Sequence, residues 1–69
     1  MTLSNLIPVL DKDQYIYVWF SDDIIGRGST STLLRRREIN AILNYTVTKI
    51  YASNNELHIH TDFKSSGTH

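Results

Sequence analysis

Two segments near the end of the chain, residues 46–52 and 57–63, carry apolar residues at every second position in part of their length: Ile50 and Ala52 in the first, and Leu57 and Ile59 in the second. Between them lies Asn54-Asn55, and Asn tolerates the positive φ that a two-residue hairpin turn requires. A turn at this dipeptide places four pairs of residues opposite each other on one face: Ala52 with Leu57, Ile50 with Ile59, Thr48 with Thr61, and Thr46 with Phe63. The pattern therefore predicts an antiparallel hairpin whose apolar side chains point into the core: Ile50, Ala52, Leu57, Ile59 and Phe63.

An earlier strand is predicted over residues 14–21, which are dense in aromatic and β-branched residues. Asp22-Asp23 is typical of a turn, and residues 24–27 are predicted to return as a shorter strand. Gly26 and Gly28 indicate a bulge or a bend near the end of that strand.

Two helical regions are predicted as well. Apolar residues at helical spacing indicate a short helix over residues 3–10, with Thr2 as its N-cap. Pro8 lacks a backbone donor, so this helix either begins at Ser4 or has a distorted last turn. Residues 32–44 predict either one helix that ends at Asn44, or a helical turn followed by a second helix from about Arg37.

These elements predict an α+β fold with the order α-β-β-α-β-β. Its four-stranded sheet is mainly antiparallel and carries the helices on one face. Residues 1–64 are expected to form a single domain, and the small, polar residues 65–69 a flexible C-terminal tail.

Composition excludes several classes of protein. The chain has 69 residues and no cysteine, which excludes disulfides and thiolate metal sites and is typical of a reducing cytosol. Seven basic residues balance seven acidic ones, so no global field attracts nucleic acid or an anionic membrane. The apolar runs are too short to span a bilayer, and the N-terminus lacks a signal-peptide pattern. We therefore expect a soluble, cytoplasmic protein without a cofactor.

The second face of the predicted sheet is rich in aromatic residues. If the even positions of residues 14–21 point toward the helices, then Tyr15, Tyr17 and Trp19 point away from them. They share their face with a further set of residues: Tyr45, Lys49, Tyr51, His58 and His60. Such a patch normally marks a contact surface, and these side chains also stack on bases. Three interpretations follow: a homodimer of sheets packed face to face, docking on another protein, or stacking on a nucleotide or single strand.

A cluster of arginines precedes the hairpin. Arg35, Arg36 and Arg37 are consecutive, and Arg27 and Lys49 are expected nearby. Arg suits bidentate recognition of phosphate or carboxylate. Three consecutive helical residues fan out, however, so the cluster forms a solvated surface unless an oligomer brings copies together around an anion. The turn Gly26 to Thr30 precedes a helix, as anion-binding turns do, but it matches neither the dinucleotide fingerprint nor the Walker loop.

Metal and catalytic chemistry have weaker signals. His58, His60 and Asp62 share one face of a strand at a spacing that a metal can bridge, yet ordinary strand alternation explains the same pattern. We therefore predict no metal site. No nucleophile lies in an activating context, and Asp22 and Asp23 face opposite ways as strand neighbours. We expect no enzymatic activity.

The overall layout resembles a group of phage proteins. The likeness is carried by the opening Thr2 to Leu10, the strand Tyr15 to Phe20, the glycine-containing turn, Leu33-Leu34, and Leu43 to Val47 with its hairpin. Together these segments resemble small uncharacterised proteins encoded by phages and prophages of Gram-positive bacteria. The resemblance covers nearly the whole chain and implies a phage origin. Small phage accessory proteins often bind host components, including defence systems.

The resemblance and the aromatic face together predict a non-enzymatic binding protein. It would occupy or sequester a host component as a counter-defence inhibitor, and its target would be a host protein or an anionic small molecule such as a nucleotide. A short chain with an aromatic second face is also expected to form a homo-oligomer. The alternatives are a nucleic-acid-binding regulator, which the neutral net charge disfavours, and a small structural or assembly subunit of a phage.

Overall fold

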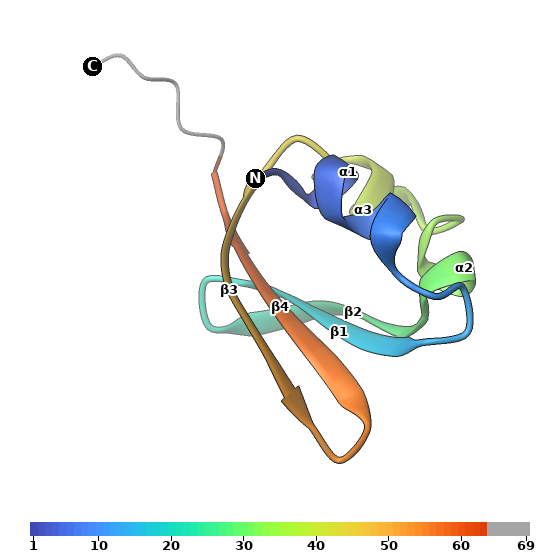
Figure 1. The fold of residues 1–69 in the computed structure, drawn as a ribbon. Coiled ribbons are helices and arrows are strands. Elements are labelled where there is room, and N and C mark those ends of the chain that lie inside the picture. Colours follow the sequence, from blue (N-terminus) through green and yellow to red (C-terminus); the bar gives the residue numbers. More distant parts are fainter. Residues whose placement is uncertain (64–69) are drawn as a thin grey trace.

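The computed structural model describes residues 1–63, which form a four-stranded sheet with short helical segments on one face (Figure 1). The elements in chain order are α1 (Leu3–Leu6), the 3-10 helix η1 (Ile7–Val9), β1 (Tyr15–Phe20), β2 (Asp23–Ser29), α2 (Thr30–Leu33), α3 (Arg37–Asn40), β3 (Thr46–Ser53) and β4 (Glu56–Asp62). The predicted α+β fold is confirmed. The predicted domain end at residue 64 and the predicted tail, residues 65–69, lie outside the described residues. Within residues 1–63, no helix has the length and apolar character needed to cross a membrane.

The sheet has the strand order β2-β1-β4-β3. The two outer pairs, β1 with β2 and β3 with β4, are antiparallel hairpins. The two central strands, β1 and β4, run parallel, because the chain passes through the helical layer between β2 and β3. The prediction of a mainly antiparallel sheet is therefore confirmed, and β2 and β3 are its edges.

The N-terminal helix changes type at its proline. Thr2 is the N-cap of α1, and its backbone N–H donates to Asn5 Oδ1 at 3.1 Å. The helix then tightens into η1, where Pro8 occupies one of the first two positions. No intrahelical donor is needed there. Of the two alternatives for Pro8, the distorted last turn is the one observed.

The middle helical region is two separate helical turns, α2 and α3. Of the two alternatives for residues 32–44, the helical turn followed by a second helix from Arg37 is the one observed. Arg36 adopts an extended backbone, with ψ at 136°, which ends helical geometry between α2 and α3. The Asn40 side-chain amide closes this connection by donating to the carbonyls of Leu34 and Arg36, both at 2.8 Å. The predicted cap at Asn44 is wrong, since α3 ends at Asn40.

The predicted hairpin turn is confirmed. Asn54 and Asn55 have φ of 52° and 66°, and the predicted pairs Ala52 with Leu57 and Ile50 with Ile59 are present. Beyond them, a bulge between Val47 and Lys49 shifts the register by one residue. The last two predicted pairs are therefore wrong, and the observed pairs are Val47 with Thr61 and Thr46 with Asp62.

This bulge moves Tyr45 to the other face of the sheet from the one predicted. Because side chains alternate along a strand, one extra residue reverses the face of everything before it. Val47 and Tyr45 consequently pack against the core. The Tyr45 ring lies 5.6 Å from the rings of both Phe20 and Phe63, measured between centroids.

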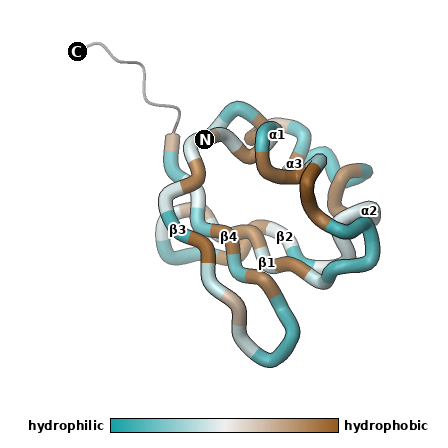
Figure 2. Tube along the Cα trace, viewed as in Figure 1, coloured by the Kyte–Doolittle hydropathy of each residue, from teal (hydrophilic) through white to brown (hydrophobic). Residues whose placement is uncertain are grey.

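The core lies between the helices and the central strands, where the hydrophobic positions of both layers face each other (Figure 2). Its fully buried side chains come from α1, β1, α2, α3 and β4: Leu3, Ile16, Val18, Leu33, Ile39 and Ile59. The alternation predicted for β1 is thus confirmed at Ile16 and Val18. Gly26 on β2 lets α3 approach closely, because a Cβ there would lie 2.9 Å from Ile39 Cδ1.

Three of the residues predicted to point into the core are exposed. Ile50 is 41% exposed and Phe63 is 65% exposed, and Ala52 is also exposed. The far half of the β3–β4 hairpin extends beyond the helical layer (Figure 1), so none of the described helices covers Ile50 and Ala52. Of the predicted set, only Ile59 is fully buried and Leu57 is partly buried.

Candidate functional site

The sheet face that points away from the helices, called the open face below, gathers most of the predicted site residues. Strand register places them in rows across the sheet. Tyr17 lies beside His58, which lies beside Tyr51. Trp19 lies beside His60, which pairs with Lys49. The open face therefore has one row of rings that runs across β1, β4 and β3, and a second row with rings on β1 and β4 that ends at Lys49 on β3.

The first row is a continuous stack of three rings. The centroids of Tyr17 and His58 are 4.7 Å apart with an interplanar angle of 6°, and those of His58 and Tyr51 are 4.8 Å apart with an angle of 0°. These separations match the spacing between neighbouring strands, about 4.8 Å. The rings therefore stand upright on the sheet, one per strand, with their faces against each other and their edges toward solvent.

The second row is tied to the first. Trp19 and His60 stack at 5.0 Å with an interplanar angle of 8°. The indole Nε1–H of Trp19 donates to His58 Nδ1 at 3.1 Å, which makes Nδ1 an acceptor and assigns the proton of neutral His58 to Nε2. Packing and hydrogen bonding thus restrict the rotation of these rings.

Two titratable groups on the open face have shifted pKa values. Burial raises the pKa of Tyr17, and the neighbouring carboxylate of Glu56 raises it further. The Tyr17 hydroxyl donates to Glu56 Oε2 at 3.3 Å. Burial lowers the pKa of His60, with smaller contributions from Lys49 and His58. His60 Nε2 is buried and has no hydrogen-bond partner among the described residues, so the imidazole is held neutral at pH 7.

A cation lies at each edge of the open face. Arg27 on β2 is the direct partner of Tyr17 on β1, so the two side chains lie on the same face, and Arg27 is exposed. Lys49 on β3 places its Nζ 5.2 Å from the centroid of the Tyr51 ring, within range of a cation–π interaction. Tyr15 completes the face, with its ring 5.5 Å from that of Tyr17.

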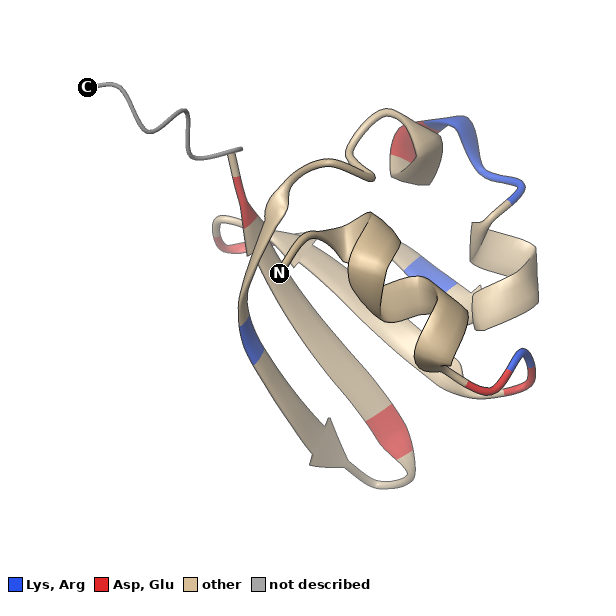
Figure 3. Ribbon diagram, turned by 45° about the horizontal axis from the view of Figure 1, so that its top comes forward, with Lys and Arg blue, Asp and Glu red and all other residues tan. Residues whose placement is uncertain are grey.

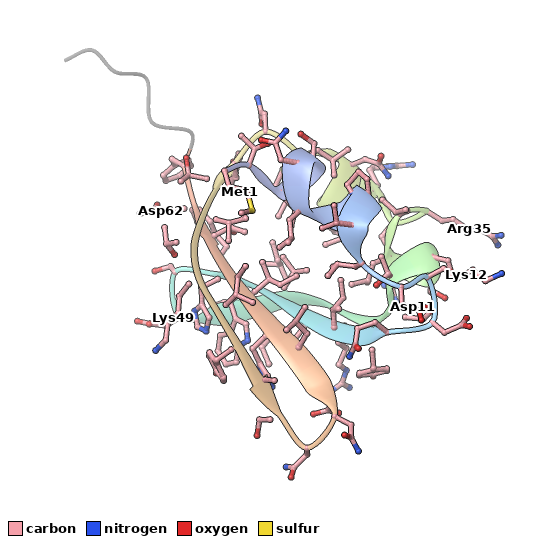
Figure 4. The ribbon with its side chains drawn as sticks, viewed as in Figure 1. Met1, Asp11, Lys12, Arg35, Lys49 and Asp62 are labelled. Carbon is pink, nitrogen blue, oxygen red and sulfur yellow. The ribbon has the colours of Figure 1, made fainter. Side chains whose placement is uncertain are left out.

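The three arginines just before and at the start of α3 lie elsewhere. Arg35, Arg36 and Arg37 are exposed in the helical layer (Figure 3), and Figure 4 shows Arg35 and Lys49 on opposite sides of the molecule. Arg36 faces Glu38 at 3.9 Å. It also lines a depression of about 320 Å³ at the β2 edge together with Arg27. Of the predicted arginine cluster, only Arg36 is thus brought near Arg27.

The structure brings no third ligand to the predicted metal pattern. His58 and His60 stack on other rings, and Asp62 Oδ1 accepts from the backbone N–H of Phe63 at 2.7 Å. Across residues 1–63, no three His, Asp or Glu side chains gather as a metal site would require.

The sequence prediction missed one member of the open face. Glu56 pairs with Ser53 next to the turn and accepts the Tyr17 hydroxyl. The signal was present, because Glu56 lies two residues from His58 and therefore on the same face of β4.

One cavity is a feature separate from the open face. It has a volume of about 480 Å³ and lies in the helical layer, lined by residues that include Ile7, Leu43 and Lys12. Its lining contains none of the predicted site residues. The open face is therefore the candidate site. No family model, curated protein or solved structure matches this chain.

Proposed function

We propose that this protein is a non-enzymatic binding module that docks on another protein through its open face. The observation that carries the proposal is the upright stack of Tyr17, His58 and Tyr51. It bears directly on the choice between a protein partner and a stacked nucleotide.

A nucleotide or single strand that stacks on a sheet requires free ring faces. In the first row, both faces of His58 and the facing sides of Tyr17 and Tyr51 are already in contact with each other. Trp19 and His60 use a face each in the same way. The open face thus presents ring edges, tyrosine hydroxyls and the His58 Nε2–H. Apolar bodies with polar tips are typical of protein interfaces, in which Tyr, Trp and Arg are enriched.

The positive charges of the open face favour a partner that is not the open face of a second copy. Arg27 and Lys49 lie on the two edge strands. Two copies packed face to face in an aligned manner would bring cation against cation and bury both. A partner surface with carboxylates or carbonyl oxygens at matching positions complements the cations instead. The stacked, hydrogen-bonded rings are also preorganised, which reduces the side-chain entropy lost on binding.

The resemblance to phage proteins supports a host protein as the partner. In this proposal the protein acts in the host cytoplasm by occupying a host component, as a counter-defence inhibitor does. The neutral net charge counts against a nucleic-acid regulator, because phosphate-binding proteins usually carry a basic surplus. Sequestration of a nucleotide and a role in phage assembly are distinguished from this proposal by experiment.

The test is affinity capture from a bacterial lysate, with mass spectrometry of the captured proteins and of extracted small molecules. The open-face variant is Arg27→Ala with Tyr51→Ala. The matched control is Arg35→Ala with Arg37→Ala, which changes exposed residues of the helical layer. We expect a stoichiometric host protein to be retained by the wild type and the control, and to be lost by the open-face variant.

Other outcomes would redirect the proposal. A nucleotide that is retained by the wild type and lost by the open-face variant would support sequestration. Recovery of phage structural proteins alone would support an assembly subunit. Equal capture of the host protein by all three forms would contradict docking through the open face. EDTA is expected to leave capture unchanged.

A further inference from the structure

Among residues 1–63, no strand pairs with residues 49–53 of β3 on the side away from β4, so this edge of β3 is free to pair. In a two-residue hairpin, the residues next to the turn form a hydrogen-bonded pair, and such pairs then alternate along the ladder. Ser53 with Glu56 is the first pair and Tyr51 with His58 is the next of the same kind. The backbone N–H and C=O groups of Ile50 and Ala52 therefore point away from β4, toward the free edge.

The bulge limits the regular part of this edge. Pairing shifts between Val47 and Lys49, so the uninterrupted stretch is residues 49–53. Tyr51 is its central residue. Two antiparallel copies of such a stretch use all five residues only when the two-fold axis passes between the two Tyr51 residues.

We propose that the free edge of β3 pairs with β3 of a second copy of this chain, in the register that places Tyr51 opposite Tyr51. Ile50 then lies opposite Ala52 of the second copy, and Lys49 opposite its Ser53. The result is one continuous eight-stranded sheet. This inference does not depend on the proposed function, because the dimer leaves the open face of each copy uncovered.

The ring stack supports this register. Its rings repeat at 4.7 and 4.8 Å, one per strand, and Tyr51 is the last ring because β3 is the last strand. A second copy places its Tyr51 one strand spacing further, in a non-hydrogen-bonded pair, where opposing side chains approach most closely. The stack then continues through six rings: Tyr17, His58 and Tyr51 of one copy, followed by Tyr51, His58 and Tyr17 of the other.

Charge and apolar burial favour the same register. Lys49 meets the small, uncharged Ser53 of the second copy, so like charges do not oppose each other across the edge. Beyond that Ser53 lies Glu56, toward which the long Lys49 side chain can extend. On the opposite face, Ile50, now 41% exposed, packs against Ala52 of the second copy. A register centred on Ile50 would instead pair Ala52 with Thr48, where the bulge interrupts the strand.

The direct test introduces a single cysteine, because the chain has no cysteine of its own. In the proposed register Tyr51→Cys places two cysteines in a facing non-hydrogen-bonded pair, whose Cα separation of about 4.5 Å allows a disulfide. The matched control is Tyr15→Cys, because Tyr15 is 39% exposed and Tyr51 is 38% exposed. In a glutathione redox buffer, we expect Tyr51→Cys to become mainly a covalent dimer and Tyr15→Cys to remain uncrosslinked. Crosslinking of Tyr15→Cys instead would indicate face-to-face packing and overturn the proposal.

A second variant tests the backbone contact. Ile50→Pro removes an N–H that points to solvent in the monomer, and proline is accepted on edge strands. In the dimer this N–H donates to Ala52 of the second copy, so two hydrogen bonds are lost by symmetry. We expect the dissociation constant of the dimer, measured by light scattering, to rise by about tenfold or more, with an unchanged circular dichroism spectrum. A wild-type protein that is monomeric at high concentration, or a Tyr51→Cys variant that does not crosslink, would overturn the proposal.

Discussion

Ile16, Val18 and Ile59 are fully buried on the helix-covered face of the sheet, whereas Tyr15 and Tyr51 on the open face are 39% and 38% exposed. The covered face is packed by a second layer, the helices. No described element covers the open face, and its side chains instead pack against each other across the strands. The difference shows that burial of apolar side chains on one face of a sheet can stabilise the fold while the other face remains available for contact.

The largest expected effect separates two directly paired residues. Ile59 and Ile50 are cross-strand partners, but Ile59 is fully buried under the helices and Ile50 is 41% exposed. Ile59→Ala should lower the free energy of unfolding by about 2–5 kcal/mol, because it leaves a cavity in the core. Ile50→Ala should lower it by less than about 1 kcal/mol. Urea denaturation at low protein concentration measures both. Equal losses of unfolding free energy for the two variants would contradict the claim that the helices cover Ile59 and leave Ile50 exposed.

The sequence predicted the turn of the β3–β4 hairpin but not its bulge, for a physical reason. The turn was predictable because Asn54 and Asn55 are suited to positive φ. The bulge was not, since residues 46–49, Thr-Val-Thr-Lys, contain no glycine or proline that would mark an irregularity. It coincides with contacts from the N-terminus: Val47 N–H donates to Met1 O at 2.8 Å, and Leu3 N–H donates to Tyr45 O at 3.0 Å. Such tertiary contacts are not encoded in local alternation.

The membership of the open face was predictable in part, with Tyr45 assigned to the wrong face and Glu56 missed, and its geometry was not predictable. Alternation correctly placed Tyr15, Tyr17 and Trp19 away from the core, since Ile16 and Val18 between them are buried. That the rings stand upright depends on strand register and side-chain rotamers, which composition does not specify. The sequence pattern allowed either one helix or two around the arginines. The extended backbone at Arg36 separates two helices, so Arg35 and Arg36 lie in the connection and Arg37 begins α3.

A second pair of neighbours sharpens the comparison on β2. The missing side chain of Gly26 lies toward Ile39 and Leu33 on the covered face, while Arg27 lies on the open face. Gly26→Val should lower the free energy of unfolding by about 1–3 kcal/mol, because a Cβ 2.9 Å from Ile39 Cδ1 overpacks the core. Arg27→Val should change it by about 0.5 kcal/mol or less. Thermal unfolding of both variants is the measurement, and a larger loss for Arg27→Val would contradict the assignment of faces.

The smallest expected effect is a pH dependence that originates on the open face. The pKa of His60 is lowered from its ordinary value of 6.5, mainly by burial. Below about pH 6.5, His60 of the unfolded chain therefore binds a proton, whereas His60 of the folded chain stays neutral. The free energy of unfolding consequently falls as the pH decreases toward the lowered pKa of the folded state. His60→Phe keeps a ring against Trp19 and removes this titration. Between pH 7 and 5 its unfolding free energy should fall less than that of the wild type. Parallel curves for the two proteins would contradict a neutral, buried His60.

The central claim, that the open face binds the partner, has a direct reporter. The chain contains one tryptophan, and Trp19 lies on the open face, so 5-fluorotryptophan labelling yields a single fluorine resonance. The labelled protein would be titrated with the host protein recovered by affinity capture. We predict a change in the chemical shift of this resonance and a smaller shift between H2O and D2O in the complex, because the partner covers the indole edge. An unchanged chemical shift and an unchanged solvent shift in a fully formed complex would contradict the account.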